Sequence, residues 1–232
     1  ISIKNGISQK IKSPIEAVED IRLKTHKIAA PSADNVARAL KIDQLKMIVI
    51  GTSTGGPAAL QKILSELPES FLPPILLIQH MPGTFTTAFA DRLNQLCRIK
   101  VKEAETGDVI EKGTAYLAPG GKQLEVEYVG KKNIIKILDS QPGQNYKPSV
   151  DLAFKSVAKN VSGGNILAII LTGMGSDGKE GTKALKEKGS TVWVQDEESS
   201  VVYGMPSAVV SAGLADSVLS LKDIGHYLAR KS

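Results

Sequence analysis

The sequence predicts an α/β fold: a doubly wound, mostly parallel sheet with helices on both faces and an antiparallel hairpin extension. Short, wholly apolar runs alternate with longer segments of helical periodicity, which is typical of parallel strands buried between two layers of helices. Two of these apolar runs lead into glycine-rich turns. Residues 100–140 differ, because they contain short strand-like segments separated by turn residues.

The first elements form two strand–helix pairs. Residues 47–50 are an apolar run, and after a glycine-rich turn the apolar residues of 57–67 recur at helical spacing. Pro57 suits the first helical turn, where its missing N–H is not needed. A second apolar run at 75–78 precedes a helical pattern over 84–97.

The middle of the chain predicts strands at 114–118, 124–129 and 134–138. Gly130-Lys131-Lys132 is typical of a hairpin turn between the last two. We expect this hairpin to extend the parallel sheet. A helix is then expected over 149–158.

Predicted strands and helices alternate again in the last third of the chain. The most apolar run of the chain, 166–171, enters a glycine-rich turn and is followed by a helix rich in Lys and Glu. A strand is expected at 191–194, and two further helices are expected near 206–212 and over 221–230.

Composition separates a leading segment from the main domain. The formal net charge is +5, but residues 1–46 contribute +4 of it, and Pro14 and Pro31 interrupt this segment. We interpret 1–45 as a linker and 46–232 as one folded domain. A solvated tether is the simpler reading of the linker, and a docking segment for a second domain is the alternative.

Several classes of protein are excluded by composition. Cys97 is the single cysteine, so an intrachain disulfide and a cysteine-built metal site are both ruled out. Aromatic residues are 4% of the chain and do not interleave with basic ones, which argues against nucleic-acid binding. No run approaches the roughly 18 apolar residues of a membrane span. With no signal segment either, we expect a cytoplasmic protein without membrane insertion.

The first strand ends in Gly51-Thr52-Ser53-Thr54-Gly55-Gly56, which fits the pattern G-x-S-x-G. Ligands of parallel sheets bind beyond the carboxyl ends of the strands. A tight turn there exposes the Ser53 hydroxyl, and free N–H groups at a helix start can stabilise an oxyanion. A phosphate-binding turn is the alternative, because glycine-rich turns bind anions for the same reasons.

A serine nucleophile needs a base and an orienting carboxylate. His80 directly follows the second apolar run, whereas His26 and His226 lie in the linker and in the last helix. Asp177 lies in the glycine-rich turn after 166–171, and Asp196 is the competing carboxylate.

His80 and Asp177 could instead have structural roles. His80 could cap the next helix or bond within its loop, and Asp177 could cap the helix that follows it. The chain order Ser53, His80, Asp177 differs from that of the α/β-hydrolases, which place the acid before the histidine. No metal-ligand spacing is present, and Cys97 is a weaker nucleophile candidate because no histidine adjoins it.

Seven sequence blocks together resemble one known family, the chemotaxis protein-glutamate methylesterases (CheB). They occur in order over about residues 46–231 and are Gly51-Thr52-Ser53-Thr54-Gly55-Gly56, Gln79-His80-Met81-Pro82, Ala118-Pro119-Gly120-Gly121, Pro148-Ser149-Val150-Asp151, Leu171-Thr172-Gly173-Met174-Gly175-Ser176-Asp177-Gly178, Gln195-Asp196-Glu197 and Tyr203-Gly204-Met205-Pro206.

The resemblance implies a catalytic domain that hydrolyses glutamate methyl esters on chemoreceptor helices and, in many members, deamidates receptor glutamines. It carries the catalytic serine, histidine and aspartate onto Ser53, His80 and Asp177. The oxyanion would be held by backbone N–H groups near Thr54 and Met174. No cofactor or metal is implied.

The same resemblance implies that a phosphorylatable receiver domain and its kinase control the enzyme. Residues 1–45 would be part of the linker to that receiver domain, which is absent here. One departure is Lys122-Gln123-Leu124, where many members have a histidine. The alternative to the whole interpretation is a non-catalytic nucleotide- or anion-binding α/β module.

Overall fold

The computed structural model of the chain describes residues 40–161 and 164–230. The first 39 residues of the predicted linker, including His26, lie outside the described residues.

The main sheet contains seven parallel strands in the order β3-β4-β2-β1-β7-β8-β9. Their bounds are β1 Met47–Thr52, β2 Ile75–Gln79, β3 Lys100–Glu103, β4 Thr114–Leu117, β7 Ile166–Ile170, β8 Thr191–Gln195 and β9 Ser217–Leu219. The strand β1 lies at the centre, with β2 on one side and β7 on the other.

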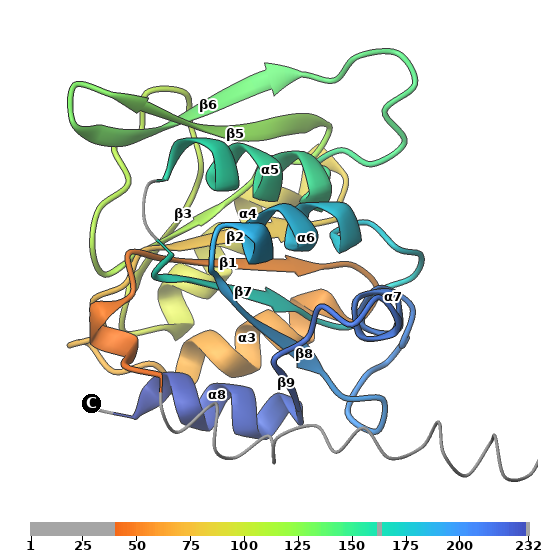
Figure 1. Cartoon of the computed structure of the whole chain (residues 1–232). Helices are drawn as coiled ribbons and strands as arrows, with labels where there is room; N and C mark the ends of the chain where they lie inside the picture. Colours follow the sequence, from red (N-terminus) through yellow and green to blue (C-terminus); the bar gives the residue numbers. More distant parts are fainter. Residues whose placement is uncertain (1–39, 162–163, 231–232) are drawn as a thin grey trace, which may run out of the picture. The chain divides into compact units, whose positions relative to one another are not determined.

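Helices cover both faces of this sheet (Figure 1). On one face lie α3 Gly56–Glu66, α4 Gly83–Leu96 and α8 Leu221–Ala229; on the other lie α5 Val150–Asn160, α6 Lys179–Glu187 and α7 Met205–Ser211. The alternation of side chains along β1 explains the two layers, because Ile48 and Ile50 pack into the first core and Met47 and Val49 into the second. The predicted fold class is therefore confirmed.

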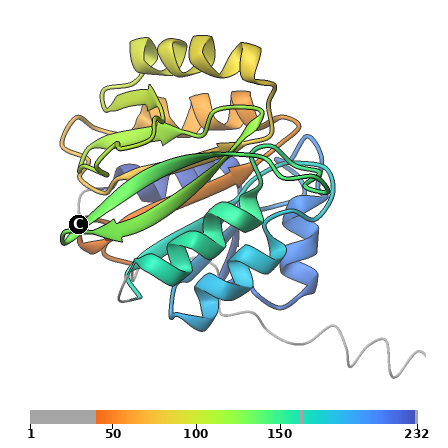
Figure 2. The same cartoon turned by 90° about the horizontal axis from the view of Figure 1, so that it is seen from above.

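The hairpin consists of β5 Lys122–Val129 and β6 Lys132–Asp139, joined by a two-residue turn. Gly130 and Lys131 both adopt positive φ, 57° and 68°, as such tight hairpin turns require. We expected the hairpin to extend the parallel sheet, but it forms a separate two-stranded sheet. Its apolar residues Leu124, Val126 and Ile135 pack instead into the core that α5 covers. The hairpin accordingly lies alongside α5 (Figure 2).

Three short elements were not predicted. The edge strand β3 has one fully buried side chain, Val101, and β9 has only three residues, so neither carries a clear apolar run. A 3-10 helix, η1, spans Ile42–Gln44. Ile42 and Leu45 are buried in the core, so the predicted domain boundary at residue 46 falls inside a packed segment.

The topology places a switch point between β1 and β7. The chain leaves β1 into α3 on one face and leaves β7 into α6 on the opposite face, so the two loops diverge. Such a switch point is where open parallel sheets bind ligands. Among the described residues, no helix combines the length and the apolar character needed to cross a membrane.

Candidate active site

Ser53 lies at the carboxyl end of β1, in the turn that enters α3. Its backbone N–H donates to the carbonyl of Thr172, 3.0 Å away, and the Thr172 hydroxyl donates to the carbonyl of Thr54 at 2.9 Å. Gly55 adopts a φ of +84°, and a Cβ there would lie 2.7 Å from the Cβ of Val201. The turn therefore needs glycine, and it leaves Ser53 partly exposed.

His80 lies beside this turn, because β1 and β2 are paired in parallel with Thr52 opposite Gln79. The buried amide of Gln79 joins the two strand ends. Its Nε2 donates to the carbonyl of Ser53 at 3.0 Å and to that of His80 at 2.9 Å. One side chain thus fixes the backbone of both residues.

His80 and Asp177 form a hydrogen-bonded pair, with 2.8 Å between Nε2 and Oδ2. The side chains are 12% and 2% exposed, so the pair is shielded from water. An ionised carboxylate only accepts hydrogen bonds, so Nε2 carries the proton that is donated. In the neutral imidazole, Nδ1 is then the atom that can accept a proton.

Asp177 is held at the start of α5. The Ser149 hydroxyl donates to its Oδ1 at 3.0 Å, and the backbone N–H of Val150 donates to Oδ2 at 2.7 Å. Burial raises the pKa of Asp177, but the bonds from His80 and from two N–H groups of α5 outweigh it, so the pKa lies below its usual value. Asp177 therefore stays ionised beside His80.

The carboxylates of Asp177 and Asp151 each accept hydrogen bonds from the start of the helix that the other residue precedes or belongs to. Asp177 precedes α6 but accepts from the first turn of α5, including the N–H of Asp151 at 3.0 Å. Asp151 lies in α5 and accepts from the N–H groups of Gly178 and Gly181 at 2.9 and 2.7 Å, at the start of α6. The alternative in which Asp177 caps α6 is met only by its bond from the N–H of Gly178 at 3.1 Å, and Asp151 supplies the acceptor for the N–H of Gly181.

The predicted oxyanion donors lie on two loops beside Ser53. Thr54 directly follows the serine, and Met174 is 67% exposed in the loop between β7 and α6. A Cβ on Gly173 would lie 2.8 Å from the Cβ of Ser53, so this loop passes directly against the serine. Within the described residues, no hydrogen bond uses the N–H of Thr54 or Met174, or the hydroxyl of Ser53.

Two further side chains at this site were not singled out from the sequence. The ring of Tyr146 stacks on His80, with centroids 4.6 Å apart and planes inclined by 12°. Ser149 belongs to one of the quoted blocks, but its contact with Asp177 leaves no signal in the sequence. Tyr146 lies in an irregular segment between β6 and α5, outside every motif.

The other candidates lie apart from this cluster. Asp196 accepts from the backbone and the hydroxyl of Ser199 and so stabilises its own loop. Cys97 is half-buried at the end of α4, where burial raises the pKa of its thiol, and His226 is exposed on α8. In the described part of the chain, no group of three His, Cys, Asp or Glu residues could hold a metal ion.

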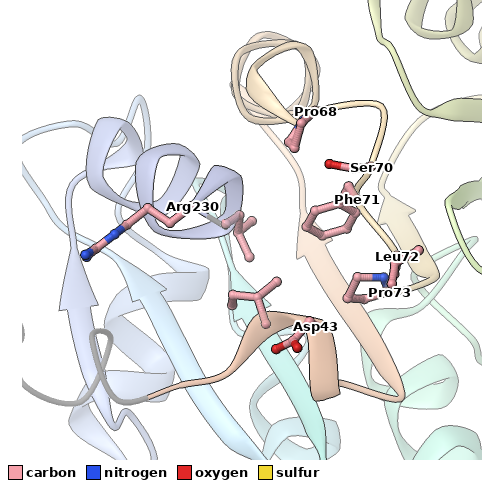
Figure 3. A pocket seen from close by; sticks show the side chains of 9 residues that line it. Asp43, Pro68, Ser70, Phe71, Leu72, Pro73 and Arg230 are labelled. Atoms are coloured by element: carbon pink, nitrogen blue, oxygen red, sulfur yellow. The ribbon is translucent and has the colours of Figure 1, made fainter. Parts of the chain in front are cut away.

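A hollow of about 290 Å³ lies at the opposite edge of the sheet (Figure 3). It is bordered by η1, by the segment that precedes β2 and by the end of α8, with Phe71, Leu72 and Pro73 in its wall. It contains no serine–histidine or histidine–carboxylate pair. The hydrogen-bonded pair of His80 and Asp177 lies instead at the carboxyl edge, next to the turn that carries Ser53.

Comparison with known proteins relates the chain to one family. The family model described as CheB methylesterase matches residues 48–228. A protein-glutamate methylesterase/protein-glutamine glutaminase 2 of Pseudomonas savastanoi is 54% identical over 203 residues, covering 88% of this chain and 51% of the relative. One of the same name from Pseudomonas fluorescens is 58% identical over 183 residues, covering 79% of the chain and 47% of the relative.

The fold matches a solved structure as well. The crystal structure of the Thermotoga maritima CheB methylesterase catalytic domain aligns with a TM-score of 0.76 at 39% identity. The alignment covers 80% of this chain and 98% of that one. The chain spans about half the length of the curated relatives it matches.

Proposed function

The chain belongs to the CheB methylesterase family, and we propose that it is a serine hydrolase that demethylates glutamate methyl esters on the cytoplasmic helices of chemoreceptors. The observation that carries this proposal is the cluster at the carboxyl edge. Ser53 is partly exposed in its turn, and His80, directly after the adjacent strand, bonds the buried Asp177 through Nε2.

The first half of the reaction forms an acyl-enzyme. The Ser53 Oγ attacks the ester carbonyl of the glutamate side chain while His80 Nδ1 takes the hydroxyl proton. Asp177 accepts from Nε2–H and stabilises the imidazolium that results. The backbone N–H groups of Thr54 and Met174 hold the oxyanion. Collapse of the tetrahedral intermediate breaks the bond to the methoxy group, which leaves as methanol with the proton from His80.

The second half releases the glutamate side chain. Water attacks the acyl-enzyme, gives one proton to His80 and forms a second tetrahedral intermediate, from which Ser53 leaves and recovers that proton. A glutamine amide would follow the same course with ammonia as the first leaving group. The names of the relatives include protein-glutamine glutaminase, and on that basis we extend the proposal to deamidation.

The proposed partners follow from the family and from the length of its members. We propose that an upstream receiver domain, phosphorylated by its kinase, controls access to the site. The non-catalytic anion-binding alternative has no support in the family match or in the names of the relatives.

Release of methanol from membranes that carry methylated receptors tests the proposal. The chain should release methanol, and it should hydrolyse free glutamate methyl ester with a much lower specificity constant, because remote contacts position the receptor ester. A chain that releases no methanol but binds inorganic phosphate would instead be the anion-binding module. Equal specificity constants for the two substrates would indicate a general small-ester hydrolase.

A further inference from the structure

Tyr146 is the residue that covers the proposed base, and we propose that it is a positioning residue that fixes the plane of the His80 ring. This inference rests on the function proposed above. The two rings are nearly parallel, inclined by 12°, with their centroids 4.6 Å apart. That geometry is a face-to-face contact between ring systems.

His80 needs such a contact because its ring has one strong anchor. The Nε2–H bond to Asp177 fixes one atom, but the histidine χ2 torsion has a broad energy profile, so one bond leaves the ring plane poorly defined. Proton transfer from Ser53 requires Nδ1 within hydrogen-bond reach and in line with the hydroxyl. A flat neighbour restricts the tilt of the ring while leaving both nitrogens free to bond.

The backbone of Tyr146 is itself held by a buried amide. Gln123, 2% exposed in β5, donates from Nε2 to the carbonyl of Tyr146 at 2.8 Å. Its Oε1 accepts from the N–H of Ser149, also at 2.8 Å. Because Ser149 donates to Asp177, this one amide supports the residues that contact both His80 and Asp177. Through Gln123, the hairpin therefore helps to hold Tyr146 and Ser149 in place at the candidate site.

The Tyr146 ring also reaches the loop that carries the proposed oxyanion donor. A Cβ built on Gly175 would lie 2.8 Å from the Tyr146 hydroxyl, so the phenol end lies directly against this residue. Gly175 adopts a φ of +84° and directly follows Met174. Tyr146 thus contacts both the proposed base, His80, and the loop that carries Met174.

Tyr146 is 38% exposed, so a contact with the receptor is the competing role. The two roles differ in what they predict for a small probe. A positioning residue affects the reaction of Ser53 with any electrophile, whereas a receptor contact affects only the binding of the receptor. A fluorophosphonate therefore separates them, since it reacts with the activated serine without engaging a receptor surface.

The experiment compares Tyr146→Ala, Tyr146→Phe and the matched control Tyr128→Ala in the full chain. Tyr128 is an exposed tyrosine of the hairpin, outside the site. We expect Tyr146→Ala to lower the rate of Ser53 labelling and the kcat for receptor demethylation about tenfold, with little change in KM. Tyr146→Phe should stay within about twofold, since it keeps the stacked face, and Tyr128→Ala should match the unmodified chain.

Three results would overturn the inference. Unchanged labelling of Tyr146→Ala with a raised KM would make Tyr146 a receptor contact. An equal loss in Tyr146→Phe would assign the effect to the hydroxyl and not to the stacked ring. An unmodified chain that is not labelled at all would overturn the proposed function, and this inference with it.

A second variant tests the support behind the ring. Gln123→Met keeps the approximate volume but removes the amide hydrogen bonds to Tyr146 and Ser149, together with those to Ser140 and Gln144. It should therefore slow Ser53 labelling about as much as Tyr146→Ala. Thermal unfolding shows whether the variant is folded. A folded Gln123→Met chain that is labelled at the normal rate would contradict the role of Gln123.

Discussion

Different kinds of side chain are buried at the carboxyl edge and at the amino edge of the parallel sheet. At the carboxyl edge three buried polar side chains, those of Gln79, Gln195 and Asp177, each bond the backbone of a neighbouring segment. At the amino edge the apolar side chains of Ile42 and Phe71 are buried and pack into the core. Buried amide and carboxylate side chains therefore hold the loops near β1 at the carboxyl edge, whereas apolar side chains cover the start of β1 and β2 at the amino edge.

The two edges should therefore respond differently to substitution. The loops at the carboxyl edge are fixed by specific hydrogen bonds and hold reactive groups in place, so changes there should affect turnover first. The amino edge contributes burial of apolar surface, so changes there should affect the free energy of unfolding and leave turnover unchanged.

Removal of the proposed nucleophile should have the largest effect. Ser53→Ala deletes one partly exposed hydroxyl that makes no hydrogen bond within the described residues, so the midpoint of thermal unfolding should hardly move. The rate of methanol release should fall about 10³-fold or more, as in other serine triads. Release by Ser53→Ala within tenfold of the unmodified chain would remove Ser53 from the mechanism.

Asp177→Asn should reduce both turnover and stability. The amide cannot stabilise the imidazolium of His80, so we expect kcat to fall by about 10²- to 10⁴-fold. The free energy of unfolding should fall by about 1–3 kcal/mol at neutral pH, because charged hydrogen bonds from the start of α5 are weakened.

The pH dependence of that loss follows from the sign of the pKa shift. The pKa of Asp177 is lowered in the folded chain, so its stabilisation is present above the pKa of an unfolded aspartate and is lost as pH falls through the folded value. Urea unfolding of both chains between pH 7 and pH 3 should therefore show the gap closing in acid. A gap that is constant with pH would exclude an ionised Asp177.

A truncation tests the amino edge. A chain that starts at residue 40 keeps η1, whereas one that starts at residue 46 loses the buried side chains of Ile42 and Leu45. Each loss should cost about 2–4 kcal/mol of unfolding free energy, measured by urea unfolding. The kcat of the shorter chain, assayed where it is folded, should match that of the longer one. A large fall in kcat would mean that the two edges are coupled.

The smallest effect is expected at the hollow of Figure 3. Leu72 is 47% exposed in its wall, so Leu72→Ala should change the unfolding free energy by less than about 0.5 kcal/mol and should not alter methanol release. A clear loss of activity in this variant would assign the hollow a part in the reaction.

The candidate site residues that follow apolar strands could be predicted from the sequence to lie at one edge of the sheet. Ser53, His80 and Asp177 each come directly after or close behind a buried run, and parallel strands bring their carboxyl ends to one edge. Residues whose role depends on an irregular path could not be predicted this way. Tyr146 reaches His80 only because the segment after β6 folds back over the site.

The burial of apolar side chains that follow no regular pattern could not be predicted from the sequence either. Ile42 and Leu45 are isolated apolar residues in a basic segment, so their packing is decided by the tertiary fold and not by periodicity. The hairpin was predicted, but its place depends on which surface buries its apolar side chains. That surface is the core beneath α5 and not the edge of the parallel sheet.

Mapping the site of fluorophosphonate labelling by peptide mass spectrometry tests the proposed nucleophile most directly. We expect a single modified peptide that contains Ser53 in the unmodified chain, and labelling slowed at least about 100-fold in His80→Gln, which lacks the base. Labelling of another serine, or equal labelling of Ser53 without His80, would contradict the claim that the strand ends of β1 and β2 assemble an activated nucleophile.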